Sequence, residues 1–295
     1  MALSIRKLHP TFGGEVVDQI VLKDVTDAAR LEDIRDAIDH YAVLVFHDQD
    51  LTNDEQAAFA ERLDGALHTK TGTAALRANR FGNEAISDIS NVDGEGQLLD
   101  ANDRKRLFGL ANRLWHTDAS FQDPPGRYSM LSARVVPPVA SDTEFADMRA
   151  AYDALGADQK ARLEGLTVHH SIAYSRRRLG FELTEKEAEI LEGAYHPLVR
   201  TLPHDGRRSL YLASHAATIV GWPVPEARML LHELMEHATE DRFVFAHSWR
   251  ALDLVIWDNR TTMHRATSFD DRTYVRDMRR VTTLDIARAG AAAAS

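Results

Sequence analysis

Short apolar runs and alternating stretches dominate the hydrophobic pattern of this chain, and they predict more strands than helices. The apolar run 41–46 has the length of a strand that is buried on both faces. Period-two alternation, or a short apolar run bounded by turn residues, marks the remaining strands. We expect these at two edge positions within 2–23 and at 85–92, 128–136, 166–171, 198–202, 209–213, 242–249, 252–257 and 274–282. The charged patch 176–178 is expected between the strands of the middle segment.

Helical spacing of apolar residues occurs at fewer places. Thr26 is expected to cap a first helix, and Thr52 with Glu55 forms the capping box of a second. Pro225 opens the clearest helix of the chain. The apolar stripe of that helix consists of Ala227, Leu230, Leu231, Leu234 and Ala238. Two further helices are expected, near 149–155 and 158–165.

No internal repeat or domain boundary interrupts this pattern, so we predict one domain over residues 1–286, with a β-rich core and helices outside it. Residues from about 66 to 112 are polar, with scattered glycines and a weak pattern. Irregular segments of this length are uncommon in compact domains unless they are functional, so this one is expected to be a lid. The alanine-rich end, 287–295, is expected to be a disordered tail.

The stretch Trp115-His116-Thr117-Asp118 holds the one His-x-Asp of a chain with 14 histidines. In a strand, residues i and i+2 point to the same face, so an imidazole and a carboxylate would lie side by side. These are two of the three ligands of a 2-His-1-carboxylate site, which leaves one face of an Fe(II) ion open. For an isolated match, a surface His and Asp at a strand end would be the better explanation. The metal interpretation gains support from Trp257–Arg260, which is followed by His264 and an arginine-rich strand.

Composition and charge narrow the class of function. The chain of 295 residues is 44% hydrophobic and 27% charged, which is typical of a globular protein with a sizeable core. Its formal net charge of −10 argues against binding to nucleic acid or to anionic membranes, so a small-molecule role is favoured. The chain has 0 cysteines, which excludes disulfides, thiolate metal sites and a cysteine nucleophile. Without a membrane span or a signal-peptide apolar region, we expect a cytoplasmic protein.

Most of the other histidines have a structural explanation. His232 and His237 look like a zinc-peptidase pair, but five residues of helix separate them by roughly 140°. They cannot share a metal ion and are expected on the polar face of the helix. His247 shares a predicted strand face with aromatic residues and is expected to be a partly buried structural histidine. His169-His170 and His215 remain open, either as pocket-lining residues or as histidines without a chemical role.

The predicted C-terminal strand places Arg276, Met278 and Arg280 on one face. If that face points into the same cavity as His264, two guanidiniums enter a poorly solvated space and need anionic partners. Planar arginine is the side chain best suited to bind carboxylates there. The alternative is a solvated basic edge strand. The residues themselves therefore suggest an open metal site with two arginines facing it.

The combined motifs resemble those of a known family. The motifs are Asn112-x-x-Trp115-His116-Thr117-Asp118, Asp142-Thr143-Glu144-Phe145, Trp257-Asp258-Asn259-Arg260-x-x-x-His264-Arg265 and Arg276-x-x-x-Arg280. They resemble the Fe(II)/2-oxoglutarate-dependent dioxygenases of the taurine dioxygenase family, and most of all the 2,4-dichlorophenoxyacetate (aryloxyalkanoate) dioxygenases. Stretches that carry the closer similarity are Arg127–Ala133, Phe145–Leu155 and Glu236–Thr239, whereas 66–84 and 172–196 match poorly.

The resemblance implies a fold and a set of site residues. The fold would be mainly β with flanking helices around a double-stranded β-helix, or jelly-roll, core. His116, Asp118 and His264 would bind Fe(II) and form the catalytic centre. Thr143 and Arg276 would bind 2-oxoglutarate, with Asn112 near both cofactor and substrate. The expected substrate contacts are Arg280, Asn112, His170 and Lys70.

The resemblance also implies a reaction. An aryloxyalkanoate would be hydroxylated at the carbon alpha to its carboxylate, with 2-oxoglutarate and O₂ consumed, as in herbicide degradation. The products would be a phenol, a 2-oxo acid such as glyoxylate, succinate and CO₂. Alternatives are the same chemistry on taurine or another alkylsulfonate, a zinc hydrolase with the same three ligands, and a non-enzymatic jelly-roll binding protein. We expect a homo-oligomer that binds a small-molecule carboxylate and neither nucleic acid nor a membrane.

Overall fold

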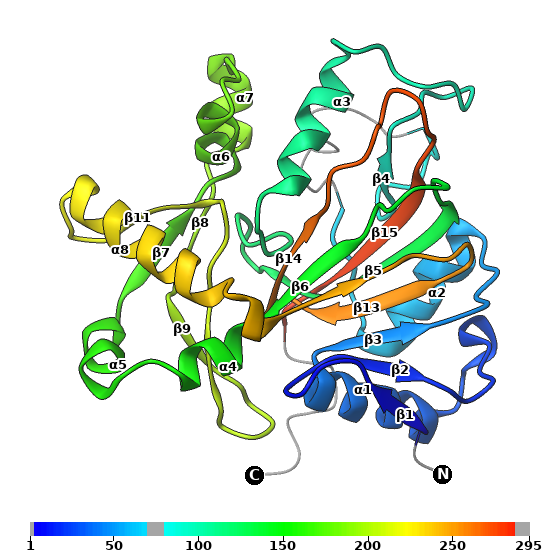
Figure 1. Cartoon of the computed structure of the whole chain (residues 1–295), viewed down its shortest axis with the longest axis horizontal. Helices are drawn as coiled ribbons and strands as arrows, with labels where there is room; N and C mark the ends of the chain where they lie inside the picture. Colours follow the sequence, from blue (N-terminus) through cyan, green and yellow to red (C-terminus); the bar gives the residue numbers. More distant parts are fainter. Residues whose placement is uncertain (1–2, 70–79, 287–295) are drawn as a thin grey trace.

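A computed structural model of the chain describes residues 3–69 and 80–286 (Figure 1). Its largest sheet has seven strands, which are antiparallel except for the pair β2 and β3. In spatial order the strands are β1 (Ile5–Lys7), β2 (Gly14–Val16), β3 (Val43–Phe46), β13 (Leu254–Asp258), β5 (Gly126–Val135), β15 (Asp277–Leu284) and β4 (Ser87–Ser90). A second sheet consists of β12 (Val244–His247), β6 (Thr143–Asp147) and β14 (Thr262–Ala266). The two sheets form the jelly-roll core that the sequence predicted.

The central strands are apolar throughout because successive side chains point to opposite faces of the sheet and both faces are covered. On β3, Val43 and Val45 face the second sheet, where Phe145 of β6 packs against Trp257 of β13 at 5.5 Å between ring centroids. Leu44, the residue between the two valines, faces the opposite way. There it packs against helices α1 (Ala28–Tyr41) and α2 (Asn53–Asp64). Both faces of the large sheet are therefore buried, as expected for a continuous apolar run.

The elements that lie between β6 and β12 in the sequence form a lateral layer on one side of the sheets (Figure 1). Its strands are β7 (Thr167–His170), β8 (Ala194–Pro197), β9 (Val199–Thr201), β10 (Arg208–Leu210) and β11 (Ala216–Ile219). Its helices are α4 (Met148–Asp153), α5 (Ala157–Leu163), α6 (Ile172–Arg178), α7 (Glu185–Ile190) and α8 (Val224–Ala238). All five residues of the predicted α8 stripe are buried. None of the helices within the described ranges is long and apolar enough to cross a bilayer.

Three local predictions were wrong. Of the two strands expected at edge positions within 2–23, only β1 lies at an edge of the sheet, because β2 pairs with β1 on one side and with β3 on the other. The arginine run 176–178, expected in a charged segment between strands, lies in helix α6. The three aromatic residues of 242–249 do not all share a face with His247, because Phe243 belongs to a 3-10 helix (Asp241–Phe243) and packs into the lateral layer. Phe245 packs instead between the two sheets.

The cap of α1 is a fourth difference. The N-cap is Asp27, and its carboxylate accepts a hydrogen bond of 2.9 Å from the amide of Arg30. Thr26, the expected cap, lies one residue outside the helix and is exposed. By contrast, the capping box of Thr52 and Glu55 on α2 is confirmed.

Replacing Asp27 by Ala is therefore expected to lower the free energy of unfolding by about 1 kcal/mol, because an amide at the helix start loses its acceptor. Thr26→Ala is the matched control and should leave stability unchanged within about 0.5 kcal/mol, as for other surface changes. Urea unfolding at constant m-value measures both. A larger loss for Thr26→Ala than for Asp27→Ala would contradict this assignment.

Candidate active site

His116 and His264 face each other across the opening of the jelly roll. The amide of His116 donates to the carbonyl of His264 at 3.0 Å, and the amide of His264 donates back at 2.9 Å. Directly opposed residues of an antiparallel pair project their side chains to the same side. The two imidazole rings accordingly lie 4.2 Å apart between centroids. The backbone pairing thus holds the two histidines side by side although they are distant in the sequence.

Asp118 completes a compact group of three. Its Oδ1 lies 3.8 Å from His116 Nε2, and its Oδ2 lies 3.6 Å from His264 Nε2. The expected strand geometry is only partly present, because His116 forms an isolated bridge and Asp118 begins a turn. Ala119, at φ 53°, reverses the chain immediately afterwards. The one-residue spacing still brings both side chains to the same point.

Hydrogen bonds fix the orientation of these side chains. His116 donates from Nδ1 to the carbonyl of Leu114 at 2.7 Å, which leaves Nε2 facing Asp118. Ser129 donates to Asp118 Oδ2 at 2.7 Å, and Asn259 Oδ1 accepts from the Asp118 amide at 3.0 Å. Asn259 also donates to Ser129 at 2.9 Å. Partners of this kind hold the ligands of a metal in place.

Burial and neighbouring charges together keep the three groups in the protonation states that bind metals. Burial lowers the pKa of His116, although the charge of Asp118 opposes this. The pKa of His264 lies well below its ordinary value, mainly through burial and then through His116. Burial acts to raise the pKa of Asp118, but the guanidinium of Arg280, the two histidines and the hydrogen bond from Ser129 together outweigh it, and the pKa is lowered. Two neutral imidazoles and a carboxylate are therefore present at neutral pH.

This donor set suits a divalent metal ion. One ligand atom from each of the three residues can be chosen so that all lie within 4.8 Å of one another. All three residues are buried, and no further carboxylate or histidine joins this group within the described part of the chain. An ion held on one face by three ligands keeps other positions free for a co-substrate and O₂.

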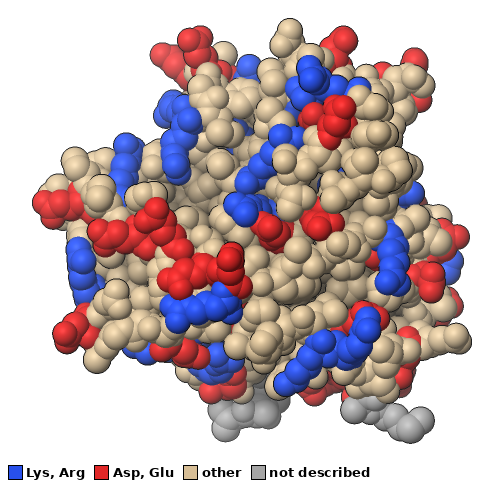
Figure 2. Space-filling view, in the orientation of Figure 1, with Lys and Arg blue, Asp and Glu red and all other residues tan. Residues whose placement is uncertain are grey.

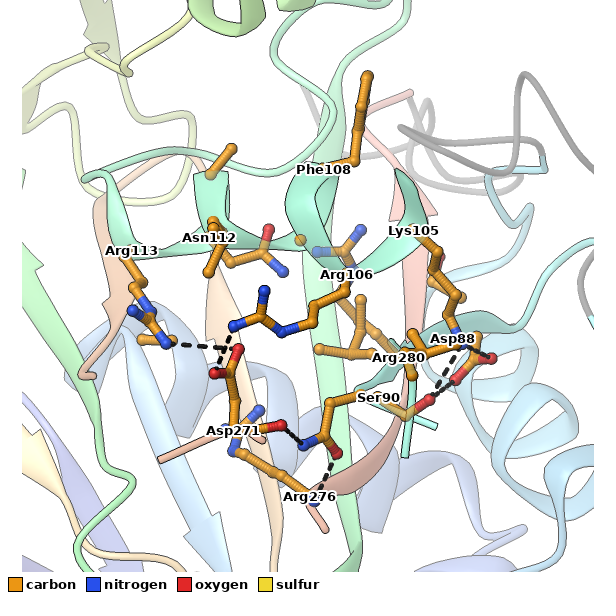
Figure 3. Close-up of a pocket in the computed structure, with 18 of the residues that line it drawn as sticks. Asp88, Ser90, Lys105, Arg106, Phe108, Asn112, Arg113, Asp271, Arg276 and Arg280 are labelled. Atoms are coloured by element: carbon orange, nitrogen blue, oxygen red, sulfur yellow. Dashed lines mark hydrogen bonds and ion pairs between the residues drawn. The ribbon is translucent and has the colours of Figure 1, made fainter. Parts of the chain in front are cut away.

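A cavity of about 450 Å³ opens beside the three residues. His116, Asp118, Arg276 and Arg280 all line it. On another side it is bounded by helix α3 (Arg104–Gly109) and the following 3-10 helix (Leu110–Arg113), which belong to the segment expected to be a lid (Figure 3). The cavity has the size of a small-molecule site. Movement of the lid segment stays a prediction.

Arg276 enters this cavity with its charge uncompensated. Its backbone amide donates to Asn91 at 2.8 Å, but its guanidinium has no hydrogen-bond partner among the described residues (Figure 3). Burial lowers its pKa to about 10, which leaves it charged at neutral pH. A buried cation without an anionic partner is unfavourable, so the geometry fits a ligand carboxylate at this position.

Arg280, the second predicted arginine, has a partner within the site. Its Nη1 donates to Oδ1 of Asp118, one of the three candidate ligands. Arg276 and Arg280 therefore line one cavity, but they differ in charge balance. Met278, which was expected on the same face, packs between the two sheets. The register of β15 against β5 shifts between Asp277 and Met278. Arg276 precedes this shift, so it does not follow the regular alternation of faces along the rest of the strand.

The remaining predicted site residues lie at different distances from this centre. Asn112 lines the cavity, as Figure 3 shows. Thr143 is buried, and its hydroxyl accepts from Trp249 Nε1 at 2.9 Å, but it is not among the lining residues. His170 is fully buried against His196 and Tyr211 and does not line the cavity. Lys70 lies outside the described residues.

Sequence reasoning missed the ion pairs that hold helix α3 against the cavity. Lys105 contacts Asp88 of β4 at 2.8 Å, and Arg106 contacts Asp271 at 2.8 Å (Figure 3). Asp271 also lies 3.7 Å from Arg113. The charged run 103–106, one aspartate followed by three basic residues, was a weak signal of such pairing, but the partners are distant in sequence. His215 lies 6.1 Å from the ring of His116 and lines the same cavity.

Comparison with known proteins places these features in context. A family model described as taurine catabolism dioxygenase TauD, TfdA family matches residues 4–282. A relative from Burkholderia sp. (strain RASC) is 45% identical over 96% of this chain and 95% of its own length. Another from Cupriavidus pinatubonensis is 43% identical over 97% and 99%. Both are named alpha-ketoglutarate-dependent 2,4-dichlorophenoxyacetate dioxygenase.

A solved structure agrees with this similarity. It is a crystal structure of AAD-2 in complex with Mn(II) and N-oxalylglycine, which is 44% identical in sequence to this chain. The superposition has a TM-score of 0.91 and covers 96% of this chain and 98% of the other. The architecture of the jelly roll and its lateral layer is therefore shared over nearly the whole length.

Proposed function

Because the chain belongs to the TauD, TfdA family of taurine catabolism dioxygenases, we propose that it oxidises an aryloxyalkanoate at an Fe(II) ion with 2-oxoglutarate (alpha-ketoglutarate) and O₂. It is a 2-oxoglutarate-dependent dioxygenase that acts on a small molecule. The observation that carries the proposed substrate class is the cavity itself, which opens beside the three candidate metal ligands and is lined by two of them, His116 and Asp118, together with two arginines. Cationic and apolar lining together suit a substrate with a carboxylate and an aryl ring.

Each group of this chain has a defined role in the proposed reaction. His116, Asp118 and His264 would hold the Fe(II), which, with 2-oxoglutarate and O₂, supplies the oxidising power for breaking an unactivated C–H bond. Arg276 would bind the distal carboxylate of 2-oxoglutarate, and Thr143 can donate its hydroxyl hydrogen because the oxygen already accepts from Trp249. The rate enhancement then comes largely from binding and orienting the reactants.

The chemistry of the substrate completes the sequence of events. Hydroxylation of the carbon between the ether oxygen and the carboxylate gives a hemiacetal. This collapses as the bond between the alpha carbon and the ether oxygen breaks: the new hydroxyl group becomes the carbonyl of glyoxylate, and its proton passes to the phenolate oxygen. One molecule of 2-oxoglutarate becomes succinate and CO₂ as one O₂ is consumed, so each phenol is matched by one succinate.

A substrate panel tests the proposal. Purified protein with Fe(II), 2-oxoglutarate and O₂ is supplied separately with aryloxyacetates, aryloxypropionates, taurine and longer alkylsulfonates, and succinate and phenol are measured. We expect succinate and phenol in equal amounts with aryloxyalkanoates. Succinate formation that responds to sulfonates and not to aryloxyalkanoates would favour the alkylsulfonate alternative and refute the aryloxyalkanoate assignment.

Arg280 is proposed to face the carboxylate of the substrate and to keep its hydrogen bond to Asp118. Arg280→Ala should weaken aryloxyalkanoate binding and leave the half-saturation for 2-oxoglutarate nearly unchanged. It should also produce succinate in excess of phenol, because an unanchored substrate no longer presents its alpha carbon to the metal. The succinate-to-phenol ratio across a substrate titration measures this effect.

Arg279→Ala is the matched control, since Arg279 bonds Asp277 and does not line the cavity. Normal coupling and normal substrate half-saturation in Arg280→Ala would show that Arg280 serves Asp118 alone.

Acidic and basic side chains are interspersed on the face drawn in Figure 2. The cytoplasmic location, the homo-oligomeric state and the absence of nucleic-acid or membrane binding stay predictions.

A further inference from the structure

A third arginine lines the active-site cavity, and neither the motifs nor the proposed reaction uses it. Arg176 of helix α6 is 6% exposed and borders the same cavity as His116 and Asp118. Its two neighbours in the sequence, Arg177 and Arg178, are exposed and lie away from this cavity. The burial of Arg176 therefore does not follow from its position in a solvated basic run.

No carboxylate compensates the charge of Arg176 in the part of the chain that the structure describes. Nη1 donates to the hydroxyl of Ser175 at 3.1 Å, and Nε is buried without any hydrogen-bond partner. The guanidinium stacks over the ring of Phe108, with 4.5 Å from Cζ to the ring centroid. One flat face is thus covered by an aromatic ring, and most of the N–H donors remain unused. A ligand that accepts hydrogen bonds would satisfy them.

The surroundings of Arg176 are apolar and aromatic. Phe108, Phe121 and Ile172 line this end of the cavity, and Phe121 packs at 5.1 Å from the ring of His215. Through Nδ1, His215 contacts the same Ser175 hydroxyl at 3.1 Å. This aromatic part of the cavity wall suits an aryl ring, whereas Arg280 beside the candidate metal ligands suits a carboxylate.

We propose that Arg176 binds an anionic or hydrogen-bond-accepting substituent on the aryl ring, so that preferred substrates carry an acceptor group at both ends. The inference rests on the aryloxyalkanoate activity proposed above and narrows its substrate class. Planar arginine pairs with a carboxylate through two parallel hydrogen bonds, so an aryl carboxylate is the substituent that the site fits best. Arg176 is then a specificity-determining residue beside the aromatic part of the cavity wall.

The test compares two substrates of similar size, 4-carboxyphenoxyacetate and 4-methylphenoxyacetate. The measured quantity is the ratio of their kcat/KM values, from the phenol that each releases. In the wild type this ratio should favour the carboxylated substrate, and Arg176→Met should lower it roughly tenfold or more, the effect of losing one charge-assisted interaction. Arg176→Lys, which keeps the charge but loses the planar fork, should give an intermediate ratio. Arg177→Met is the matched control and should leave the ratio unchanged.

The outcomes separate the possible roles of Arg176. A wild-type preference for the methyl substrate would overturn the inference even if no variant folds. An unchanged ratio in a folded Arg176→Met protein, or a raised half-saturation for 2-oxoglutarate with the ratio intact, would also overturn it and indicate a structural or cofactor-binding role. Phenol from neither substrate would refute the proposed function and the inference with it, whereas unselective phenol release from both would refute the inference alone.

Discussion

Replacing His116, Asp118 or His264 by Ala is expected to abolish Fe(II)-dependent formation of succinate and phenol while leaving a folded protein. The three side chains offer the one group of clustered ligand atoms among the described residues. Loss of a partner that merely orients a ligand costs roughly 10- to 100-fold. Loss of the ligand itself should cost more, because two remaining ligands neither retain the ion firmly nor position it.

The same variants should lose the stabilisation that a bound metal gives. A ligand that binds only the native state raises Tm, and the stabilisation grows with the logarithm of the ligand concentration divided by its Kd. Anaerobic thermal unfolding with and without Fe(II) would therefore show a shift in the wild type and little or none in the three variants. His232→Ala serves as the control, because His232 is exposed and pairs with Glu236 on α8. Near-normal turnover in all three variants would refute the site assignment, and failure to fold would indicate a structural role.

Arg276→Ala is expected to raise the concentration of 2-oxoglutarate needed for half-saturation by roughly 10- to 100-fold. The estimate follows from the loss of a charge-assisted hydrogen bond, about 1.5–3 kcal/mol. The variant should otherwise fold normally, because the guanidinium makes no hydrogen bond to a described residue. Removing an uncompensated buried charge should even raise stability in the absence of 2-oxoglutarate.

Titration of 2-oxoglutarate at saturating substrate measures this effect. Thr143→Ala should give a smaller increase, since a neutral hydroxyl contributes about 0.5–1.5 kcal/mol. Arg279→Ala again provides the control on the same strand. An unchanged half-saturation for Arg276→Ala would show that the distal carboxylate of 2-oxoglutarate binds elsewhere in the cavity.

Local patterns in the sequence were sufficient to locate most strands and helices. Period-two alternation and continuous apolar runs identified β3, β5 and β13 because these strands bury both faces between α1, α2 and the second sheet. Helical spacing identified the stripe of α8 because the residues of that stripe are buried. The lateral layer was predicted less well. Helix α7 has no buried residue, and α6 carries three arginines in its last turn, so neither shows an amphipathic pattern.

The metal-binding motif was visible in the sequence, but the reason for its geometry was not. The backbone pairing of His116 with His264 joins distant segments, and no local pattern encodes it. Asn259 was part of the motif, yet its bonds to the amide of Asp118 and to Ser129 could be seen only in three dimensions. Nothing in the sequence indicated that Arg176 lines the cavity, because its sequence neighbours are exposed arginines.

The cross-strand pairing of His116 with His264 also bears on when the protein acquires its metal during synthesis. A growing chain presents His116 and Asp118 long before the ribosome has made His264, and the pairing that aligns the histidines needs strand β14 in place. Contacts of such long sequence separation form late in folding. Iron loading is therefore expected to follow translation and closure of the jelly roll. Until then the nascent chain holds no complete iron centre that could react with O₂ and damage it.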